Sequence, residues 1–406
     1  MRVRYLSCAG LLACTACAPE SVRSNADRSV QDVRNAEPRE AWAAVTQSPW
    51  PAAQGADDSR VGSLVKACGT NDAAIMSVAR EIATTRARGL GAPDIDAVTS
   101  MLRSAGEPHM SPRVLFASGK APLDDNDLVT KLGALRAAVS SRRGQSTSCG
   151  VAFARTPDGG EIFVGIVVDV LADLAPLPVR ARTGQWLSFD ARAHVPLHGA
   201  TFIVLGPRGA PRTVPTAVNT QTGAVRARFA LDQPGAFTVQ LVGDLDDGPR
   251  PLLEARVFAD VEPPTAPEVG AAPGEEAASG NDAEASLTAM IGALRRADNL
   301  PALRRDRRLD AIARAHAARM RDKGIVAHDL GDGDLRARLS ANGPLPRVVG
   351  ENVARANTIV LAHRALYASA SHRMNLLHAD YTNLGVGVAK ANDGSVYVCE
   401  VFTTAR

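Results

Sequence analysis

The chain carries little net charge and few aromatic residues. Across 406 residues the formal charge at pH 7 is +3, and Phe, Trp and Tyr together make up 4%. No stripe of basic residues is interleaved with aromatic ones, which is the usual mark of a nucleic-acid-binding surface. Nucleic acid is therefore not an expected partner. The arginines between 295 and 308 predict a solvated helix entry, with contact to anionic envelope polymers as the weaker interpretation.

Long hydrophobic runs are lacking too. Past the first residues, no run reaches the roughly 18 apolar residues that a membrane-spanning helix needs. Residues 1–17 have another layout, a basic start followed by a short apolar run ending in small residues, which predicts a secretory signal peptide. Its Leu11-Leu12-Ala13-Cys14 resembles a bacterial lipobox. Cys14 is the expected lipidation site and Cys17 the alternative; an ordinary signal peptide would leave the protein secreted.

This start of the chain predicts where the protein works. It would be exported and lipid-anchored in the bacterial cell envelope, and no aspartate follows the cysteines as a retention signal, which favours the outer membrane or cell surface. Cys68 and Cys149 are then the candidates for a disulfide in an oxidising compartment. Cys399 has no evident partner and is expected to be a buried free thiol. No cysteine or histidine cluster outside the processing site suggests structural zinc.

Two polar stretches that contain alanine and proline divide the rest. Residues 18–58 are predicted to be a flexible tether and residues 263–284 an interdomain linker. Between them, residues 178–262 alternate apolar and polar positions, as at Leu187, Phe189 and Ala191, with Gly-Pro and Pro-Gly turns between short segments. This pattern predicts an all-β immunoglobulin-like sandwich. The fold class is therefore multidomain α+β.

The last third holds an ordered set of motifs. Apolar residues at helical spacing run from Leu309 to Met320, with Gly324 as a plausible C-cap. His328, the tripeptide Gly350-Glu351-Asn352, a second helix at about 358–368 and the segment Ser369 to Leu377 follow. Two strands at 384–390 and 395–402, joined by Asn392-Asp393-Gly394, close the chain.

This order of motifs resembles the bacterial branch of the CAP superfamily, or SCP-like extracellular domains, over about residues 285–406. The resemblance implies an α/β/α sandwich that acts outside the cell, with lipids, peptides or wall polymers as candidate ligands. Three family positions carry over to this chain: His328, Glu351 and His372. Where bacterial members have a tryptophan and a Pro-Gly pair, this chain has Leu366 and Ala370-Ser371. A second pocket glutamate has no counterpart.

Two histidines and a glutamate allow three kinds of chemistry. Neutral imidazoles are common metal ligands, so His328 and His372, with Glu351 ligating or orienting them, could hold zinc or another divalent metal. Without metal, the three could act as a general acid–base pair. The third alternative is a structural polar cluster. His316 is expected to be a core histidine, and His363 and His378 to lie on the surface or behind the site.

Each of these kinds of chemistry implies a different function. The leading hypothesis is a ligand-binding cleft at His328, Glu351 and His372 that holds a metal, an extended ligand or both. The alternative is a metal-assisted, peptidase-like hydrolase in which Glu351 activates water. The second alternative is a structural envelope protein with a vestigial site. Ser369 and Ser371 lack a Gly-x-Ser-x-Gly elbow, so a serine hydrolase is not expected. Oligomeric state does not follow from the sequence.

Residues 59–177 form the remaining predicted unit, of α+β type. Its segment from Ile75 to Gly89 echoes the helix around Ile312, and its segments at 150–154 and 162–168 echo the final two strands. No Gly-Glu-Asn and no Ser-x-x-His accompany them. One interpretation is a degenerate CAP-like copy without a site, and the other is an unrelated α+β domain.

Overall fold

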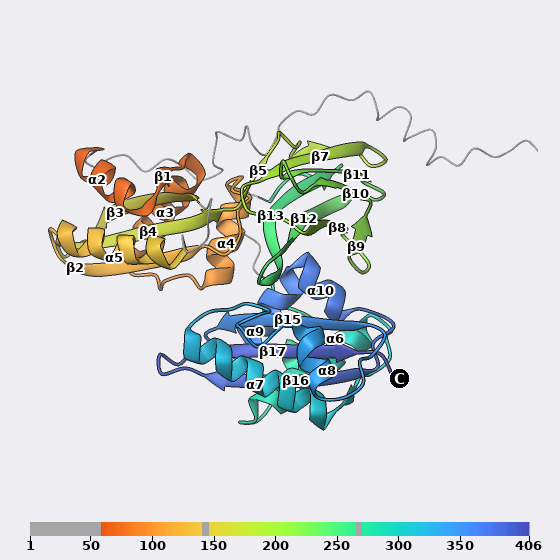
Figure 1. Ribbon diagram of the computed structural model, residues 1–406. Helices are drawn as coiled ribbons and strands as arrows, with labels where there is room; N and C mark the ends of the chain where they lie inside the picture. Colours follow the sequence, from red (N-terminus) through yellow and green to blue (C-terminus); the bar gives the residue numbers. More distant parts are fainter. Residues whose placement is uncertain (1–57, 140–145, 265–269, 406) are drawn as a thin grey trace, which may run out of the picture.

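The computed structural model describes residues 58–405 except 140–145 and 265–269 (Figure 1). The predicted signal peptide, with Cys14 and Cys17, and nearly all of the predicted tether lie outside the described residues. The rest forms three units: an N-terminal unit at 58–170, a β-sandwich at 172–260 and a C-terminal unit at 270–405. Within these described ranges, no helix is both long and apolar enough to cross a membrane.

The N-terminal unit has one four-stranded sheet covered by helices on both faces. Its elements are α2 (Asp58–Cys68), β1 (Thr70–Asn71), α3 (Ala73–Ala87), α4 (Ile95–Ser104), β2 (Arg113–Lys120), α5 (Asp125–Val139), β3 (Ser146–Arg155) and β4 (Gly160–Val170). The strand order is β1-β3-β4-β2. Helices α3 and α4 pack on one face and α2 and α5 on the other. A disulfide between Cys68 and Cys149 ties the end of α2 to β3.

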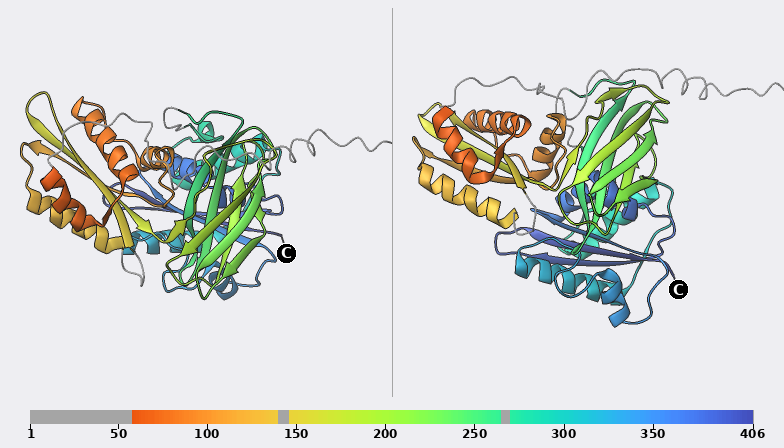
Figure 2. Two further views of the ribbon diagram at one scale, coloured as in Figure 1. Left: turned by 90° about the horizontal axis from the view of Figure 1, so that it is seen from above. Right: turned by 45° about the horizontal axis from the view of Figure 1, so that its top comes forward.

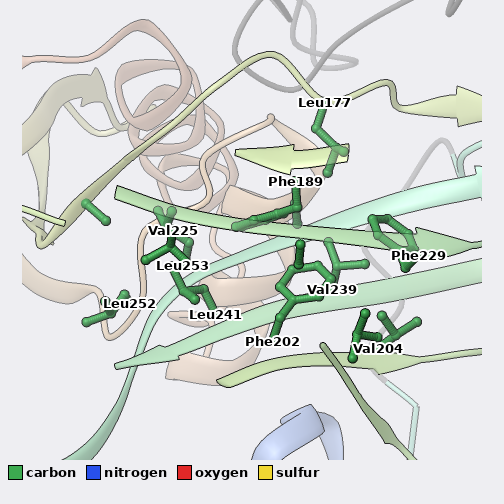
Figure 3. Packing of buried hydrophobic residues seen from close by; sticks show 14 of the residues in the cluster. Leu177, Phe189, Phe202, Val204, Val225, Phe229, Val239, Leu241, Leu252 and Leu253 are labelled. Carbon is green, nitrogen blue, oxygen red and sulfur yellow. The ribbon is translucent and has the colours of Figure 1, made fainter. Parts of the chain in front are cut away.

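The middle unit is a sandwich of two mainly antiparallel sheets. Its strands are β5 (Ala172–Leu174), β6 (Arg180–Ala181), β7 (Trp186–Ala193), β8 (Gly199–Leu205), β9 (Arg212–Val214), β10 (Thr216–Asn219), β11 (Ala224–Ala230), β12 (Gly235–Leu245) and β13 (Gly248–Ala259). The sheet orders are β10-β11-β7-β5 and β6-β13-β12-β8-β9. Phe189, Phe202 and Phe229 meet between the sheets (Figure 3). The alternating sequence pattern therefore reflects one buried face per strand.

The C-terminal unit is again a four-stranded sheet between two helical layers. Its elements are η2 (Glu275–Ala277), α6 (Ala283–Ala297), β14 (Arg304–Arg305), α7 (Arg307–Lys323), α8 (Leu335–Ala341), β15 (Val349–Ala356), α9 (Ile359–Ala368), α10 (Ala370–Leu376), β16 (Asn383–Lys390) and β17 (Val396–Thr403). The strand order is β14-β16-β17-β15, the same as in the N-terminal unit with the same strand directions. Helices α6 and α9 pack on one face, and α7 and α8 on the other.

Helix α7 forms where the sequence predicts it. Asp306 caps its first turn through bonds from Arg308 N and Leu309 N, and Gly324 ends it in the left-handed conformation at φ 66°. The predicted apolar face is buried. Strand β16 lies so close to this helix that a Cβ at Gly385 would come within 2.3 Å of the Leu309 carbonyl carbon. Glycine at this position is therefore required by helix–strand packing.

The structure differs from the sequence prediction for the second half of the linker. Residues 270–282 do not run free; they pack on the C-terminal unit. Glu275 accepts hydrogen bonds from Arg364 at 2.8 and 2.6 Å, and His363 Nε2 lies 3.0 Å from the Pro273 carbonyl oxygen. Proline, glycine and glutamate are typical of linkers, and the ion pair that anchors this stretch comes from a helix some 90 residues later, which local composition cannot reveal.

The sandwich lies beside the N-terminal unit and above the C-terminal unit in Figure 1, and it contacts both (Figures 1 and 2). Toward the N-terminal unit, Arg103 Nε donates to Glu254 Oε1 at 3.2 Å, and Glu254 N donates to the Pro108 carbonyl oxygen at 2.8 Å. Toward the C-terminal unit, β8 and β12 pack against α10. The three units are thus joined through the middle one.

Candidate functional site

Glu351 is the buried centre of the site. It lies on β15, and both of its oxygens face Arg338 of α8, with Nη1–Oε1 at 2.9 Å and Nη2–Oε2 at 3.0 Å. His328 Nδ1 lies 2.9 Å from Oε2. Arg338 Nη2 also donates to the His328 carbonyl oxygen at 2.9 Å. The arginine therefore ties the His328 loop to the strand that carries the glutamate.

These neighbours decide the charge of Glu351. Burial by itself would raise the pKa of this carboxyl, but the hydrogen bond from His328 and the positive charge of Arg338 outweigh burial and lower the pKa to about 2. Glu351 is therefore a carboxylate anion throughout the physiological range. A base with so low a pKa, with both oxygens already accepting hydrogen bonds, is poorly suited to take a proton from water.

His328 presents one ring nitrogen away from the carboxylate. Because Glu351 is ionised and can only accept, the facing Nδ1 of His328 carries a proton and donates to the carboxylate. The side chain is 19% exposed, and Nε2 makes no hydrogen bond within the described part of the chain. The Glu351 carboxylate thus fixes the orientation of the His328 ring.

His372 approaches from α10, on the other side of β15. Burial lowers its pKa to about 4, and the charge of His328 contributes in the same direction, so the ring is neutral at pH 7. Its carbonyl oxygen accepts a hydrogen bond from Asn352 Nδ2 at 3.2 Å. His328 acts on the pKa of His372 electrostatically, but of the two only His328 forms a hydrogen bond with Glu351.

Each residue of the tripeptide Gly350-Glu351-Asn352 has a distinct role. A Cβ at Gly350 would lie 2.2 Å from the Tyr381 hydroxyl oxygen, so only glycine lets that ring approach. Asn352 is fully buried and donates to the His372 carbonyl oxygen and to Glu400 Oε2. Asn352 Oδ1 accepts from Asn375 Nδ2 at 2.9 Å. The tripeptide thus places the carboxylate on one face of the sheet and anchors α10 on the other.

The family comparison agrees with this arrangement. Residues 288–401 match the model of the cysteine-rich secretory protein family, CAP. The C-terminal unit is a CAP domain. No curated protein matches the chain in sequence.

Several solved structures are similar to the chain at low identity. An outer surface protein from Borrelia burgdorferi is 22% identical over 30% of this chain and 90% of its own, with a TM-score of 0.29. An extracellular SCP-domain protein from Bacillus anthracis is 18% identical over 54% of this chain and 82% of its own, with a TM-score of 0.28. A cysteine-rich secretory protein from Staphylococcus aureus is 13% identical over 65% and 84%, with a TM-score of 0.26.

In the CAP domain Glu351 orients His328, which is one of the two roles considered for this residue beside a metal. Among the described residues, no group of three or more His, Cys, Asp or Glu side chains is placed to hold a metal ion. Glu351 does not fit a ligand role here, because Arg338 binds both of its oxygens and the Cys399 thiol donates to Oε1 at 3.3 Å. His328 Nε2 and the His372 ring are the remaining candidate donors. A metal held by these two stays a prediction.

Two residues of the CAP site were missed in the sequence. Arg338 lies between Leu335 and Leu339 on the inner side of α8. An arginine at a position where the helical spacing predicts an apolar residue could have indicated a buried charge. Glu400 is a lone acid inside the otherwise apolar strand β17. It is fully buried, and its Oε1 has no partner among the described residues. Burial raises its pKa to about 7, with the bond from Asn352 acting in the opposite direction.

The other residues singled out in the sequence lie around the CAP site. His316 is fully buried and its Nε2 faces the Ala327 carbonyl oxygen at 2.9 Å, as expected of a core histidine. His363 is fully buried rather than at the surface, and His378 stacks on Tyr381. The hydroxyls of Ser369 and Ser371 lie 3.3 Å apart. Cys399 is a buried free thiol.

Proposed function

We propose that this protein is an exported cell-envelope protein whose CAP domain binds an extended ligand, a lipid, a peptide or a wall polymer, at His328 and His372. The observation that carries the proposal is the pairing of His328 Nδ1 with the Glu351 carboxylate at 2.9 Å. It fixes the orientation of the other ring nitrogen, Nε2. His372, whose pKa is lowered to about 4, is a second, neutral imidazole, and in this proposal the two rings bind a hydrogen-bonding group or a metal ion.

Binding is favoured over catalysis by the state of Glu351. A hydrolase would need this carboxylate to accept a proton, and the Arg338 pair and the low pKa oppose that step. The metal-assisted hydrolase therefore remains the alternative, and it requires Arg338 to leave Glu351. A structural protein with a vestigial site is the second alternative, and in that case loss of the histidines changes stability alone.

The test is NMR of histidine side chains in the whole mature protein. Zinc chloride, phosphatidylglycerol vesicles and soluble wall fragments are added separately. At least one probe is expected to shift the His328 and His372 resonances and leave His194, an exposed histidine of the sandwich, unchanged. His328→Gln should abolish the effect. If none of the probes shifts either ring, the binding proposal fails. If zinc alone does so, the two-histidine metal site gains support.

Export and anchoring are the second part of the proposal. The lipobox-like segment makes Cys14 the lipid-bearing residue, with Cys17 as the alternative. Labelling cells with an alkyne fatty acid tests this directly. Label should appear on the wild-type protein and disappear in Cys14→Ala. Loss only in Cys17→Ala would move the site, and no label on wild type would leave a secreted protein.

We further infer that the N-terminal unit is a degenerate CAP-like copy and that the sandwich is immunoglobulin-like. Gly150 of β3 and Gly385 of β16 occupy the same place: each packs against the third residue of a helix of its own unit, Ile75 in α3 and Leu309 in α7. Each glycine also faces the strand position, Ile166 or Val401, that pairs with the site strand. Shared strand order and shared close packing support a common fold.

The copy replaces the charged pair of the site with apolar residues. Asp94 and Asp334 cap α4 and α8 in the same way, and the fourth residue after each cap is Val98 in one helix and Arg338 in the other. Across the sheet, Val114 pairs with Ile166 where Glu351 pairs with Val401. Val98 and Val114 therefore stand where Arg338 and Glu351 stand. An N-terminal unit without a site follows from this.

A further inference from the structure

The sandwich touches the loop that carries His328. Strands β12 and β13 are joined by a tight turn at residues 245–248, here called the 245–248 turn. The Asp247 carbonyl oxygen accepts a hydrogen bond from Asp329 N at 3.2 Å. A Cβ at Gly248 would lie 2.8 Å from the Cβ of His328. The turn therefore covers one side of this histidine.

The same sandwich also holds the helix that carries His372. Gln240 of β12 is fully buried; its Oε1 accepts from Ser371 N at 2.9 Å and its Nε2 lies 3.3 Å from Ser369 Oγ. Figure 1 shows α10 at the edge of the CAP domain that faces the sandwich. An apolar cluster joins them. Its residues are Ile203, Leu205, Val242 and Ala370, with Met374 partly buried against them.

Gln240 is in turn held from the far side. Its Nε2 donates to Glu254 Oε2 at 2.7 Å, and Glu254 Oε1 accepts from Arg103 of the N-terminal unit. Arg103, Glu254 and Gln240 are all buried. Because unpaired buried polar groups are costly, this row of hydrogen bonds keeps Gln240 in the orientation that meets α10.

The contacts between the sandwich and the CAP domain involve particular segments but few apolar residues. They fall on the two segments that carry His328 and His372, yet the shared apolar cluster has only four fully packed residues. The core of the sandwich itself is far larger and lies on the opposite face of β12, around Leu241 and Val239. Interfaces of this modest kind separate without unfolding of the domains beside them.

We propose that the β-sandwich is an autoinhibitory clasp on the CAP cleft, closed by the 245–248 turn over His328 and by Gln240 and Val242 on α10. A ligand reaches the two histidines when the sandwich moves off the CAP domain. The clasp rests on the proposed function only in that it regulates access to that cleft.

Accessibility of the two rings is measured without any ligand. Diethyl pyrocarbonate modifies neutral imidazoles, and residue-resolved mass spectrometry at pH 7 follows the rate at each histidine of the whole protein. His194, on the sandwich surface, is the internal reference. At this pH His372 is neutral, so slow modification of the wild type reports cover rather than charge.

The first variant pair consists of Gly248→Ala and Gly209→Ala. Both glycines sit in sandwich turns at positive φ, 100° and 85°, so both substitutions strain the backbone. Only Gly248 faces the CAP domain; nothing lies within 4 Å of a Cβ at Gly209. Gly248→Ala is expected to raise the rates at His328 and His372 several-fold, and Gly209→Ala to leave them at the wild-type value.

The second pair keeps the test decisive if Gly248→Ala fails to fold. Val242→Lys places a charge in the interdomain cluster, outside the sandwich core, and Val261→Lys places one at an exposed position just after the sandwich. Only Val242→Lys should raise both rates. Unchanged rates in both Gly248→Ala and Val242→Lys, or equal rises in the controls, would overturn the clasp. If the modification rates at His328 and His372 rise but none of the NMR probes binds, the proposed function would be contradicted and the clasp supported.

Discussion

Arg338 and Glu351 form a buried, bidentate ion pair, with nitrogen–oxygen distances of 2.9 and 3.0 Å. This pair explains why a glutamate can lie inside the domain as an anion, and why that anion orients His328 instead of acting on water. The charge of Glu351 on its strand is balanced by Arg338 on a neighbouring helix.

Removing the Arg338 side chain alone should strongly destabilise the protein. Arg338→Met leaves the Glu351 charge buried without its partner, and the free energy of unfolding is expected to fall by about 3–5 kcal/mol. Urea denaturation at pH 7 measures this. Arg319→Met, which removes an exposed ion pair to Asp332, should cost at most about 1 kcal/mol. The double variant Arg338→Val/Glu351→Val reproduces the residues of the N-terminal unit and should regain most of the loss. No recovery would argue against equivalence of the two positions.

Glu400 should make the protein less stable as pH rises. Its pKa is about 7 in the folded protein against an ordinary value of 4.5, so the folded state binds the extra proton between these values. The stabilising effect of that proton is full below pH 4.5 and is lost as pH rises to 7. Glu400→Gln lacks this loss. The difference in unfolding free energy between Glu400→Gln and the wild type should therefore change by something on the order of 3 kcal/mol in favour of the variant from pH 4.5 to pH 8. Parallel curves for the two proteins would contradict the assignment.

His372 should act in the opposite direction. Its pKa is about 4 when folded against an ordinary 6.5, so the unfolded chain takes up the proton first as pH falls. Stability present above pH 6.5 is lost progressively down to pH 4. His372→Gln should flatten the stability curve across this window, as seen by thermal melts in steps of half a pH unit. Glu351 contributes lower, from pH 4.5 to about 2, so its effect is separable. An unaltered slope between pH 6.5 and 4 would show that His372 is not the group responsible.

Gly350→Ala tests how the tripeptide is packed. The new methyl group would meet the Tyr381 hydroxyl, and the destabilisation is expected to be about 1–3 kcal/mol. Gly62→Ala is the matched control, because it lies in helix α2 with open space around it and should stabilise by about 0.5–1 kcal/mol. Opposite signs for the two changes are the expected result of chemical denaturation. Two changes of the same sign would mean that the Tyr381 contact is not limiting.

Local patterns in the sequence were enough for much of the CAP domain. The apolar spacing from Leu309 to Met320 predicts the inner face of α7, and Gly324 predicts its end. The final strands were expected at 384–390 and 395–402 and occur at Asn383–Lys390 and Val396–Thr403. These features depend on near neighbours in the chain, where helical and strand periodicity determine which side chains are buried.

The interactions that define the site were not accessible in the same way. Arg338 pairs with a strand 13 residues later, and Gln240 meets a serine 131 residues away. The spacing of residues in one sequence does not predict contacts between residues on different elements. Glu351 shows the difficulty, because a glutamate could either bind a metal or orient a histidine, and its actual partner Arg338 lies on helix α8.

The hydrogen-bonded row from Arg103 through Glu254 and Gln240 to Ser371 has a consequence for how such a protein can change over generations. Multidomain proteins are often rearranged by exchanging whole modules. Replacing the unit at either end with an unrelated domain would remove a hydrogen-bond partner of Gln240 or Glu254. A buried polar atom would then be left unpaired. Gln240 and Glu254 therefore tie the sandwich to both neighbouring units, and a substitution at either position has to be accommodated on both sides at once.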